Sequence, residues 1–218
     1  MYQNNSSEIE ICGMVSPPRR RQGIFTGLLA AALPEIARRG SPETLLVVDR
    51  ACPAGVAFAQ ARSGVLKHSE YRMSQAVAPP ITSGLRDVSL RAAVPADFEF
   101  LADCLERAFG RPMSDGSDGT LSQETTNRLK LHTVIEEGGA PVGTMLVDRL
   151  DESAGIYGFA VLPELQGKGI GRAALTRVSH ELRSAGVESV HLEVLVDNPG
   201  ALHLYESCGF VPEGVEDY

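Results

Sequence analysis

The hydrophobic pattern is clearest between residues 155 and 185. Residues 156–162 are apolar or aromatic and end at a proline, which predicts a strand. Three glycines at alternating positions follow in residues 166–171, and apolar side chains then recur every four positions. This period predicts an amphipathic helix with one buried stripe: Ile170, Ala174, Val178 and Leu182. The stretch therefore places the start of a helix, behind a glycine-rich turn, at the end of a buried strand.

The same rules predict elements along the rest of the chain. In the first part we expect residues 1–7 to be polar and frayed. We expect the following further elements there: a strand at 8–15, an alanine-rich helix ending near Gly40, a buried strand at 45–48, a short helix at 54–62 and a strand at 68–73. Residues 74–87 have the composition of a linker. The sequence therefore predicts a break between residues 73 and 88.

Residues 88–218 hold a longer series of predicted elements. The first are a strand at 88–94, a helix from Pro95 onward, a mobile loop at 110–122 and a helix at 122–131. A hairpin of 131–136 and 142–150 comes next, followed by the strand, turn and helix described above. The last are a strand at 188–196, a helix at 199–208 and a short final strand. We therefore divide the chain into residues 1–73, a linker at 74–87 and a domain at 88–218.

The first part resembles the second with a period of about 146 residues, which indicates a domain duplication. Aligning Gly23-Ile24 with Gly169-Ile170 also superimposes the buried strands that follow each helix. The first copy is short, because it starts at the strand before its glycine turn. A half-sheet beginning at Glu8 should have an unpaired edge, and we expect the second copy or another protomer to cover it.

Composition narrows the class of protein. The 218 residues are 43% hydrophobic, without an apolar run of membrane-spanning length or a secretory leader, so we expect a cytoplasmic protein without a membrane partner. The four cysteines lack C-x-x-C spacing, which favours neither a metal site nor a disulfide. Residues 1–87 carry 10 Lys/Arg and 7 Asp/Glu, whereas residues 88–218 carry 10 and 21. The excess of acidic residues in the second part argues against nucleic-acid binding.

Backbone amides at the start of a helix bind anions, and glycines let a phosphate approach them. A P-loop would need Ser or Thr after Lys168, where Gly169 stands. A dinucleotide fingerprint fits loosely, with Glu193 or Asp197 as its acidic residue. The run Gln166-Gly167-Lys168-Gly169-Ile170-Gly171, with Val161 and Pro163 upstream, resembles the pyrophosphate loop of the GCN5-related N-acetyltransferases, written Q/R-x-x-G-x-G/A.

A second motif supports this resemblance. Residues 198–210 resemble the family's signature N-x-x-A-x-x-L-Y-x-x-x-G-F at Asn198, Ala201, Leu204, Tyr205, Gly209 and Phe210. The resemblance covers residues 88–218 fully and residues 8–73 in weaker form. It implies an α+β fold with a mixed, mostly antiparallel, twisted sheet flanked by helices, as a partial N-terminal copy and a full C-terminal copy.

The resemblance also implies the chemistry, which is transfer of an acetyl group from acetyl-CoA to a primary amine by direct attack, without a metal. Two neighbouring strands, which end in residues 159–161 and 192–194, should separate there, with a bulge at Gly158. Backbone groups of Phe159, Ala160 and Val161 would hold the pantetheine arm and the acetyl carbonyl. The pyrophosphate would bind Gln166, Gly167, Lys168, Gly169, Ile170, Gly171 and Arg172. Asn198 would hydrogen-bond the pantetheine, and Tyr205 would act as the general acid that protonates the thiolate.

Several roles stay open. Glu193, Tyr157 and Glu152 are placed to act as the general base, and a water relay would leave no trace in the sequence. The loop at 111–119, with Asp115 and Asp118, is placed where this family binds the acceptor. The acceptor itself, and a possible homodimer, are not predicted by the motifs. The alternative function is an acyl-CoA-binding regulatory or scaffold module without turnover.

The first copy lacks the residues that carry this chemistry. Phe25 replaces the last glycine of the turn and would crowd a phosphate. Pro53 stands at the position of Asn198, and Ala59 or Gln60 at that of Tyr205. We therefore expect the first copy to be non-catalytic.

Overall fold

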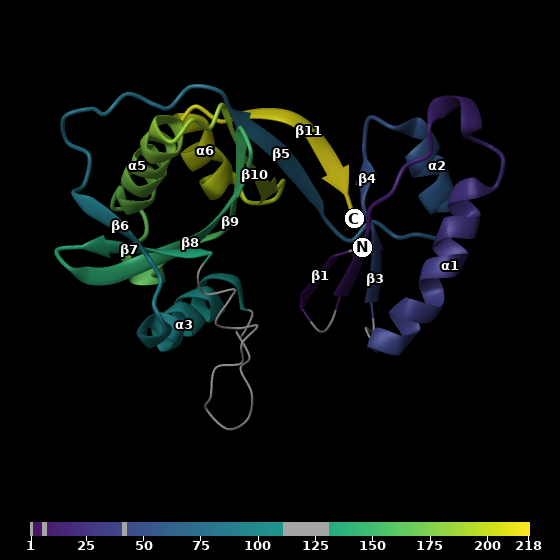
Figure 1. The fold of residues 1–218 in the computed structure, drawn as a ribbon, viewed down its shortest axis with the longest axis horizontal. Coiled ribbons are helices and arrows are strands. Elements are labelled where there is room, and N and C mark those ends of the chain that lie inside the picture. The colour runs from purple at the N-terminus through teal and green to yellow at the C-terminus, as the bar shows by residue number, and fades with distance from the viewer. Residues whose placement is uncertain (1, 6–7, 41–42, 111–130) are drawn as a thin grey trace. The chain divides into compact units, whose positions relative to one another are not determined.

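The computed structural model describes residues 2–5, 8–40, 43–110 and 131–218. The chain forms two compact units. Unit 1 consists of Met1–Tyr71, Leu195–Asp197 and Gly214–Tyr218, and unit 2 of Arg72–Val194 and Asn198–Glu213. The boundaries of the units therefore fall within strands, among them β5 (Ser69–Gln75) and β11 (Val211–Asp217) (Figure 1).

Unit 1 contains a three-stranded sheet in the order β1-β2-β3. Strand β1 (Tyr2–Asn5) pairs antiparallel with β2 (Glu8–Ile11), which pairs parallel with β3 (Glu43–Leu46). The prediction that residues 1–7 are frayed is wrong for residues 2–5. The chain's own N-terminal strand covers the edge of β2, not the second copy or another protomer. Backbone hydrogen bonds are enough to hold such a strand. A strand of mostly polar residues has no hydrophobic alternation by which the sequence could predict it.

The helices of unit 1 follow the prediction closely. A 3-10 turn, η1 (Pro17–Arg19), precedes α1 (Ile24–Arg39), and α2 (Pro53–Ala61) follows the short strand β4 (Val48–Asp49). Ile9, Ile11 and Ile36 form the buried core between the sheet and α1. Strand β4 pairs antiparallel with the last residues of β11, and Arg50 donates to Asp217 at 2.6 Å. The last residues of the chain therefore complete unit 1.

Unit 2 is built on seven adjacent strands of one sheet, in the order β11-β5-β10-β9-β8-β7-β6. The strands not yet given are β6 (Val88–Ala92), β7 (His132–Glu137), β8 (Ala140–Leu150), β9 (Ser153–Val161) and β10 (Ser189–Leu195). Strand β5 lies between β10 and β11, although it precedes the predicted linker. Gln75 fixes it there, because its fully buried amide donates to Cys208 O at 2.7 Å and Arg183 donates to Gln75 O.

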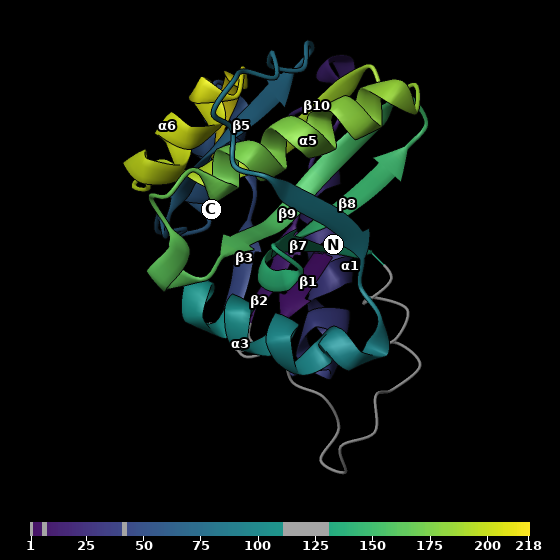
Figure 2. The same cartoon turned by 90° about the vertical axis from the view of Figure 1, so that its left-hand side faces the viewer.

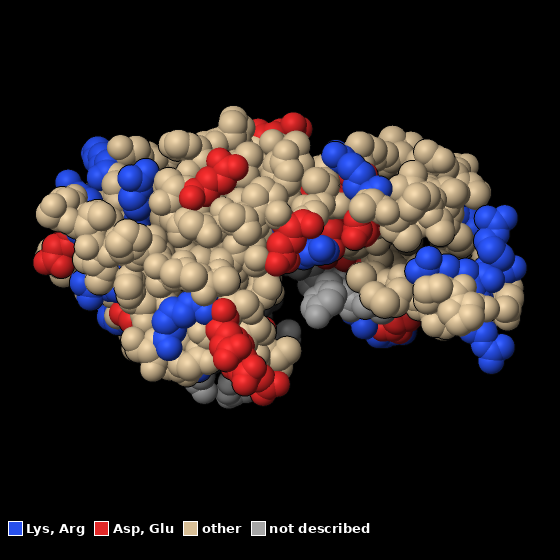
Figure 3. Space-filling view, turned by 90° about the horizontal axis from the view of Figure 1, so that it is seen from above, with Lys and Arg blue, Asp and Glu red and all other residues tan. Residues whose placement is uncertain are grey.

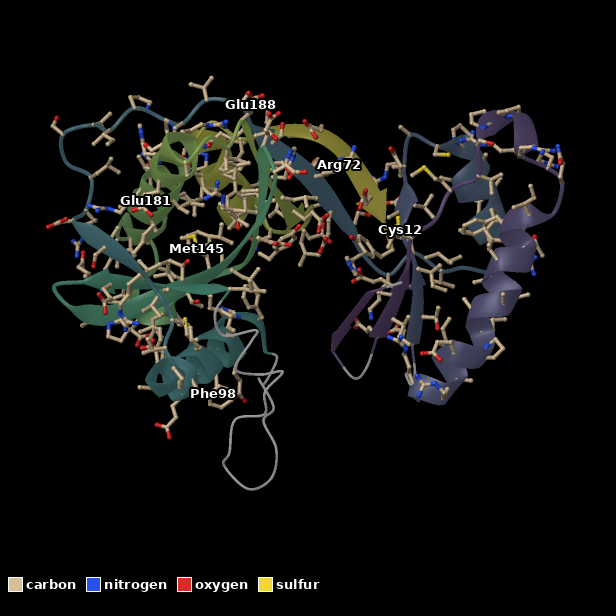
Figure 4. The ribbon with its side chains drawn as sticks, in the orientation of Figure 1. Cys12, Arg72, Phe98, Met145, Glu181 and Glu188 are labelled. Atoms are coloured by element: carbon tan, nitrogen blue, oxygen red, sulfur yellow. The ribbon has the colours of Figure 1, made fainter. Side chains whose placement is uncertain are left out.

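Helices cover both faces of this sheet (Figures 1 and 2). On one face lie α5 (Ile170–Ser184) and α6 (Pro199–Ser207), and on the other lies α3 (Phe98–Phe109), which follows η2 (Pro95–Asp97). Met145 and Leu101 are fully buried between these layers, and Figure 4 shows Met145 in the sheet and Phe98 at the start of α3. The predicted α+β architecture, a mixed and mostly antiparallel sheet flanked by helices, is confirmed.

Some predictions fall on other parts of the chain. Residues 111–130 lie outside the described residues. The predictions that fall there are the loop at 110–122 from residue 111 onward, the helix at 122–131 up to residue 130, and Asp115 and Asp118. The predicted linker lies within unit 2, where Pro79 O is 2.7 Å from His180 Nε2 of α5. The boundaries at 73 and 88 stay a prediction. None of the helices that the structure describes is long and apolar enough to cross a membrane.

Candidate active site

The site is organised around two parallel strands that separate. Strands β9 and β10 pair at Ser153 with Ser189, at Ala154 with Val190 and at Gly155 with His191. Beyond this row both strands continue, but they no longer pair with each other. The edge of β9 that faces β8 stays paired as far as Val161. The predicted separation is therefore confirmed. The backbone groups of β9 that face β10 there are left out of the ladder and can bind an extended ligand.

A bulge in β9 coincides with the separation. Thr144 pairs with Ala160 and Leu146 with Tyr157, so that Gly158 and Phe159 both lie opposite one residue of β8. Gly158 has φ +53°, a conformation that favours glycine. The predicted bulge at Gly158 is confirmed, and it turns Phe159 toward α5.

The glycine turn leaves the start of α5 without a cap. After η3 (Pro163–Leu165), Gly167 and Gly169 have φ +71° and +87°, and Gly169 is the N-cap residue without a side-chain hydrogen bond to the helix. The first amides of α5 therefore have no partner within the helix and are available to an anionic ligand. Gln166 holds the turn to the sheet, because its Nε2 donates to Val161 O at 3.0 Å.

The third glycine, Gly171, allows close packing of the neighbouring elements. A Cβ on Gly171 would lie 3.1 Å from Leu204 Cδ2 and 3.5 Å from Phe159 Cζ. Glycine at this position therefore lets α5, α6 and β9 pack closely beside the turn. The buried side chains of Ala160 and Ile170 likewise leave only their backbone for a ligand.

The structure adds a basic residue that the motifs do not predict. Arg86 Cγ lies 3.6 Å from the position that a Cβ on Gly169 would occupy. The Arg86 guanidinium donates to both carboxylate oxygens of Glu137, at 2.6 and 2.7 Å. Arg86, and more weakly Lys168, lower the pKa of Glu137. Arg86 lies far from the glycine turn in the sequence, so no local pattern could have indicated it.

Helix α6 supplies the second motif. Asn198 is its N-cap residue, with Oδ1 accepting from Ala201 N at 3.1 Å. The Tyr205 ring packs near Phe159 and Phe210, with centroids 6.4 and 6.0 Å apart. Burial, and to a lesser extent Cys208, raise the pKa of Tyr205 to about 12. Tyr205 therefore keeps its proton at neutral pH, as a general acid requires.

Buried cysteines argue against a covalent intermediate. Burial raises the pKa of the Cys104 thiol to about 11 and also raises that of Cys208. A nucleophilic cysteine needs the opposite shift, since the thiolate is the reactive form. This agrees with direct attack by the amine on a thioester.

The three candidates for the general base lie at different places. Glu152 precedes β9, where its carbonyl accepts from Glu188 N at 2.6 Å, so it lies at the far end of the paired strands. Glu193 is exposed on β10 beyond the paired row, and Tyr157 is 48% exposed on β9 just before the bulge. The last two lie where the strands separate.

Comparisons with known proteins agree with this geometry. The profile of the acetyltransferase (GNAT) family matches residues 98–210, and the chain belongs to this family of enzymes, which transfer an acetyl group to amines. A mycothiol acetyltransferase of Actinosynnema mirum is 30% identical over 214 residues, which cover 90% of this chain and 69% of the relative. A spermidine N(1)-acetyltransferase of Vibrio cholerae is 43% identical over 61 residues, which are 27% of this chain and 35% of the relative.

Solved structures share the fold. A GCN5-related N-acetyltransferase from Sphaerobacter thermophilus superimposes with a TM-score of 0.76 at 22% identity, over 97% of this chain and 72% of that one. A tandem GNAT protein from the clavulanic acid biosynthesis pathway does so with a TM-score of 0.61 at 20% identity, over 94% and 71%. Both solved structures therefore resemble this chain in fold over most of its length.

Proposed function

We propose that this protein transfers the acetyl group of acetyl-CoA to a primary amine. One observation carries the proposal: the pairing of β9 and β10 ends beside the uncapped, glycine-lined start of α5. Such an arrangement offers unpaired backbone groups for an extended pantetheine arm and helix amides for a pyrophosphate. The names of the two relatives, one acting on a polyamine, support an amine acceptor.

The roles of the site residues follow from their positions. Amides of Gly167, Gly169 and Gly171 would bind the pyrophosphate, with the exposed side chains of Lys168 and Arg172 nearby. The β9 backbone at residues 159–161 would bind pantetheine and polarise the acetyl carbonyl. The lone pair of the neutral amine attacks the thioester carbon, the C–S bond breaks, and the nitrogen loses one proton to a base or to solvent. Tyr205 donates its proton to the departing thiolate and regains one from solvent. Asn198 can offer Nδ2 to pantetheine while Oδ1 caps α6.

We also propose that the chain is a tandem duplication with a non-catalytic first copy. The helix starts support this, since α1 and α5 each begin behind a glycine N-cap in the left-handed region, Gly23 and Gly169. Each is followed by a strand and then by a helix with proline at its first position, Pro53 and Pro199, so that Cys52 stands at the position of Asn198, one residue before the predicted Pro53. In the proposal β5 of the first copy and β11 of the second are equivalent strands.

Partners and location stay predictions. On the face in Figure 3, Lys and Arg predominate over unit 1, whereas both signs are interspersed over unit 2. This charge pattern supports a small amine as partner of unit 2 in preference to a nucleic acid. We propose a cytoplasmic protein, and we leave homodimer formation to a light-scattering measurement.

The test is turnover with defined amines. The full chain is incubated with acetyl-CoA and either spermidine or glucosamine, and both the released CoA thiol and the mass of the amine are followed. The proposal predicts equimolar thiol and N-acetylated amine. Saturable acetyl-CoA binding without thiol release beyond the rate without protein would favour the regulatory module, and absence of binding would contradict the proposal altogether.

A further inference from the structure

A row of polar residues crosses the sheet of unit 2 on the face that carries α3. Val134 of β7 packs against Leu101 of α3 and lies opposite Thr144 of β8. Side chains two positions apart on a strand share a face, so Leu146 is on the α3 face as well. Its partner Tyr157 is therefore also there. This face is opposite the one where α5 and α6 carry the glycine turn and Tyr205.

The row contains Asp148, Gly155 and His191. Gly155 of β9 pairs with Asp148 of β8 on one side and with His191 of β10 on the other. Directly opposed residues of a sheet have neighbouring side chains, so these two flank the space above Gly155. This is the last paired row before β9 and β10 separate.

Tyr157 fills the space above Gly155. A Cβ at position 155 would lie 2.5 Å from the Tyr157 hydroxyl oxygen, so the tyrosine ring folds back over the glycine. The phenol oxygen therefore lies over Gly155, whose partners in the neighbouring strands are the exposed Asp148 and the half-buried His191. Only glycine at 155 permits this position of the ring.

Ser189 orients the His191 ring. Ser189 Oγ lies 2.9 Å from His191 Nε2. If Nε2 carries the proton and donates to Oγ, Nδ1 holds the lone pair. Within the described part of the chain, no hydrogen bond to Nδ1 is formed. The imidazole can therefore accept a proton from a ligand that approaches between the separating strands.

The geometry points to His191 as the general base of the acetyl transfer, with a protonated primary amine as the acceptor that Asp148 attracts. This inference rests on the proposed function. The acceptor enters from the α3 face, and its ammonium N–H bond breaks as the proton passes to His191 Nδ1, directly or through the Tyr157 hydroxyl. The freed lone pair forms the C–N bond, the C–S bond breaks, and the now positively charged nitrogen releases its second proton to solvent, from which Tyr205 is later reprotonated. Tyr205, reached from the other face, protonates the thiolate.

Charged groups around His191 are of both signs. Asp148 and Glu193 are acidic, and Tyr157 lies beside the ring. The other neighbour of β10 is β5, on which Arg72 (labelled in Figure 4) alternates to the face opposite to that of Gln75. Arg72 is 3.9 Å from Glu213. Arg72 is thus already paired with a carboxylate, which limits its repulsion of an incoming cation.

The test compares acceptors that do and do not need deprotonation. Spermidine and glucosamine are ammonium ions at neutral pH to a large extent, whereas hydroxylamine is mostly neutral. His191→Gln should lower kcat/KM for spermidine and glucosamine about 100-fold, in the range of general-base catalysis, and that for hydroxylamine less than about 5-fold. The acid limb of the kcat/KM profile should disappear. Asp148→Asn should raise KM for spermidine while kcat stays within about 2-fold.

His180→Gln is the matched control, because His180 lies on α5, away from the row of Asp148, Gly155 and His191, and its ring contacts Pro79 O at 2.7 Å. It should leave the rates unchanged. An equal loss with all acceptors, loss of acetyl-CoA binding in His191→Gln, or an unchanged acid limb would overturn the assignment. Wild-type protein that binds acetyl-CoA but acetylates none of the three would overturn this acceptor class. Wild-type protein that does not bind acetyl-CoA would instead refute the proposed function.

Discussion

Tyr205→Phe removes one hydroxyl group and leaves the packing of α6 intact. The ring is 8% exposed and lies near Phe159 and Phe210, contacts that phenylalanine keeps. We therefore expect a change in stability of about 1 kcal/mol or less, the usual net contribution of one hydrogen bond. With a pKa of about 12, roughly one phenol in 10⁴ is ionised at pH 8, so nearly every wild-type molecule carries the catalytic proton.

Loss of a general acid should lower kcat about 10²- to 10⁴-fold at pH 8. Thiol release from acetyl-CoA measures kcat, and calorimetry measures the Kd of acetyl-CoA, which should stay within about 2-fold. Because the pKa of Tyr205 is high, the wild-type profile should show no alkaline loss of rate from Tyr205 below about pH 11. Tyr218→Phe, in unit 1, is the matched control. A variant Tyr205→Phe with at least a third of the wild-type kcat would refute the acid role.

Three further outcomes are expected. Gly171→Ala should lower Tm by a few degrees and raise KM for acetyl-CoA, because its Cβ would lie 3.1 Å from Leu204; an unchanged thermal melt would show that α6 yields freely. Arg86→Ala should weaken acetyl-CoA binding about 3- to 10-fold at low salt by calorimetry, and equal Kd values would separate this residue from the anion site. The hydrogen bond from Arg91 lowers the pKa of Asp97, so the Asp97 carboxylate stabilises the fold above about pH 4, and this stabilisation is lost as the pH falls further. In urea unfolding, the free energy of unfolding of Asp97→Asn should therefore fall less between about pH 5 and pH 2 than that of wild type. Parallel curves for the two proteins would contradict this.

Local sequence patterns predicted the elements that carry the site. The strand, glycine turn and helix at 156–184 lie within a few residues of their predicted positions, since periodicity and glycine punctuation act over short distances. The bulge at Gly158 was predicted for the same reason. The helix predicted at 199–208 is α6, and Asn198 is its N-cap residue. Its role toward pantetheine stays a prediction, as do the binding roles of the glycine turn.

Features that depend on pairing between distant segments were missed. Nothing in the sequence indicated that β5 lies between β10 and β11, because its neighbours are more than 100 residues away along the chain. Strand β1 was missed because polar strands have no hydrophobic period. Arg86 and the row of Asp148, Gly155 and His191 come together only through sheet register and the path of residues 76–87. Register follows from the assembled sheet, so single-sequence patterns carry little information about it.

The most direct test of the account is calorimetric titration of acetyl-CoA into wild type, Gly169→Glu and Gly23→Glu. Both glycines are N-cap residues with positive φ, and a Cβ at either position meets no heavy atom closer than 3.6 Å, so the two substitutions impose similar strain. The account predicts saturable one-to-one binding to wild type and Gly23→Glu, and its loss in Gly169→Glu, where a carboxylate would occupy the anion site. Undiminished binding to Gly169→Glu, or none to wild type, would contradict the central claim that the start of α5 holds the cofactor.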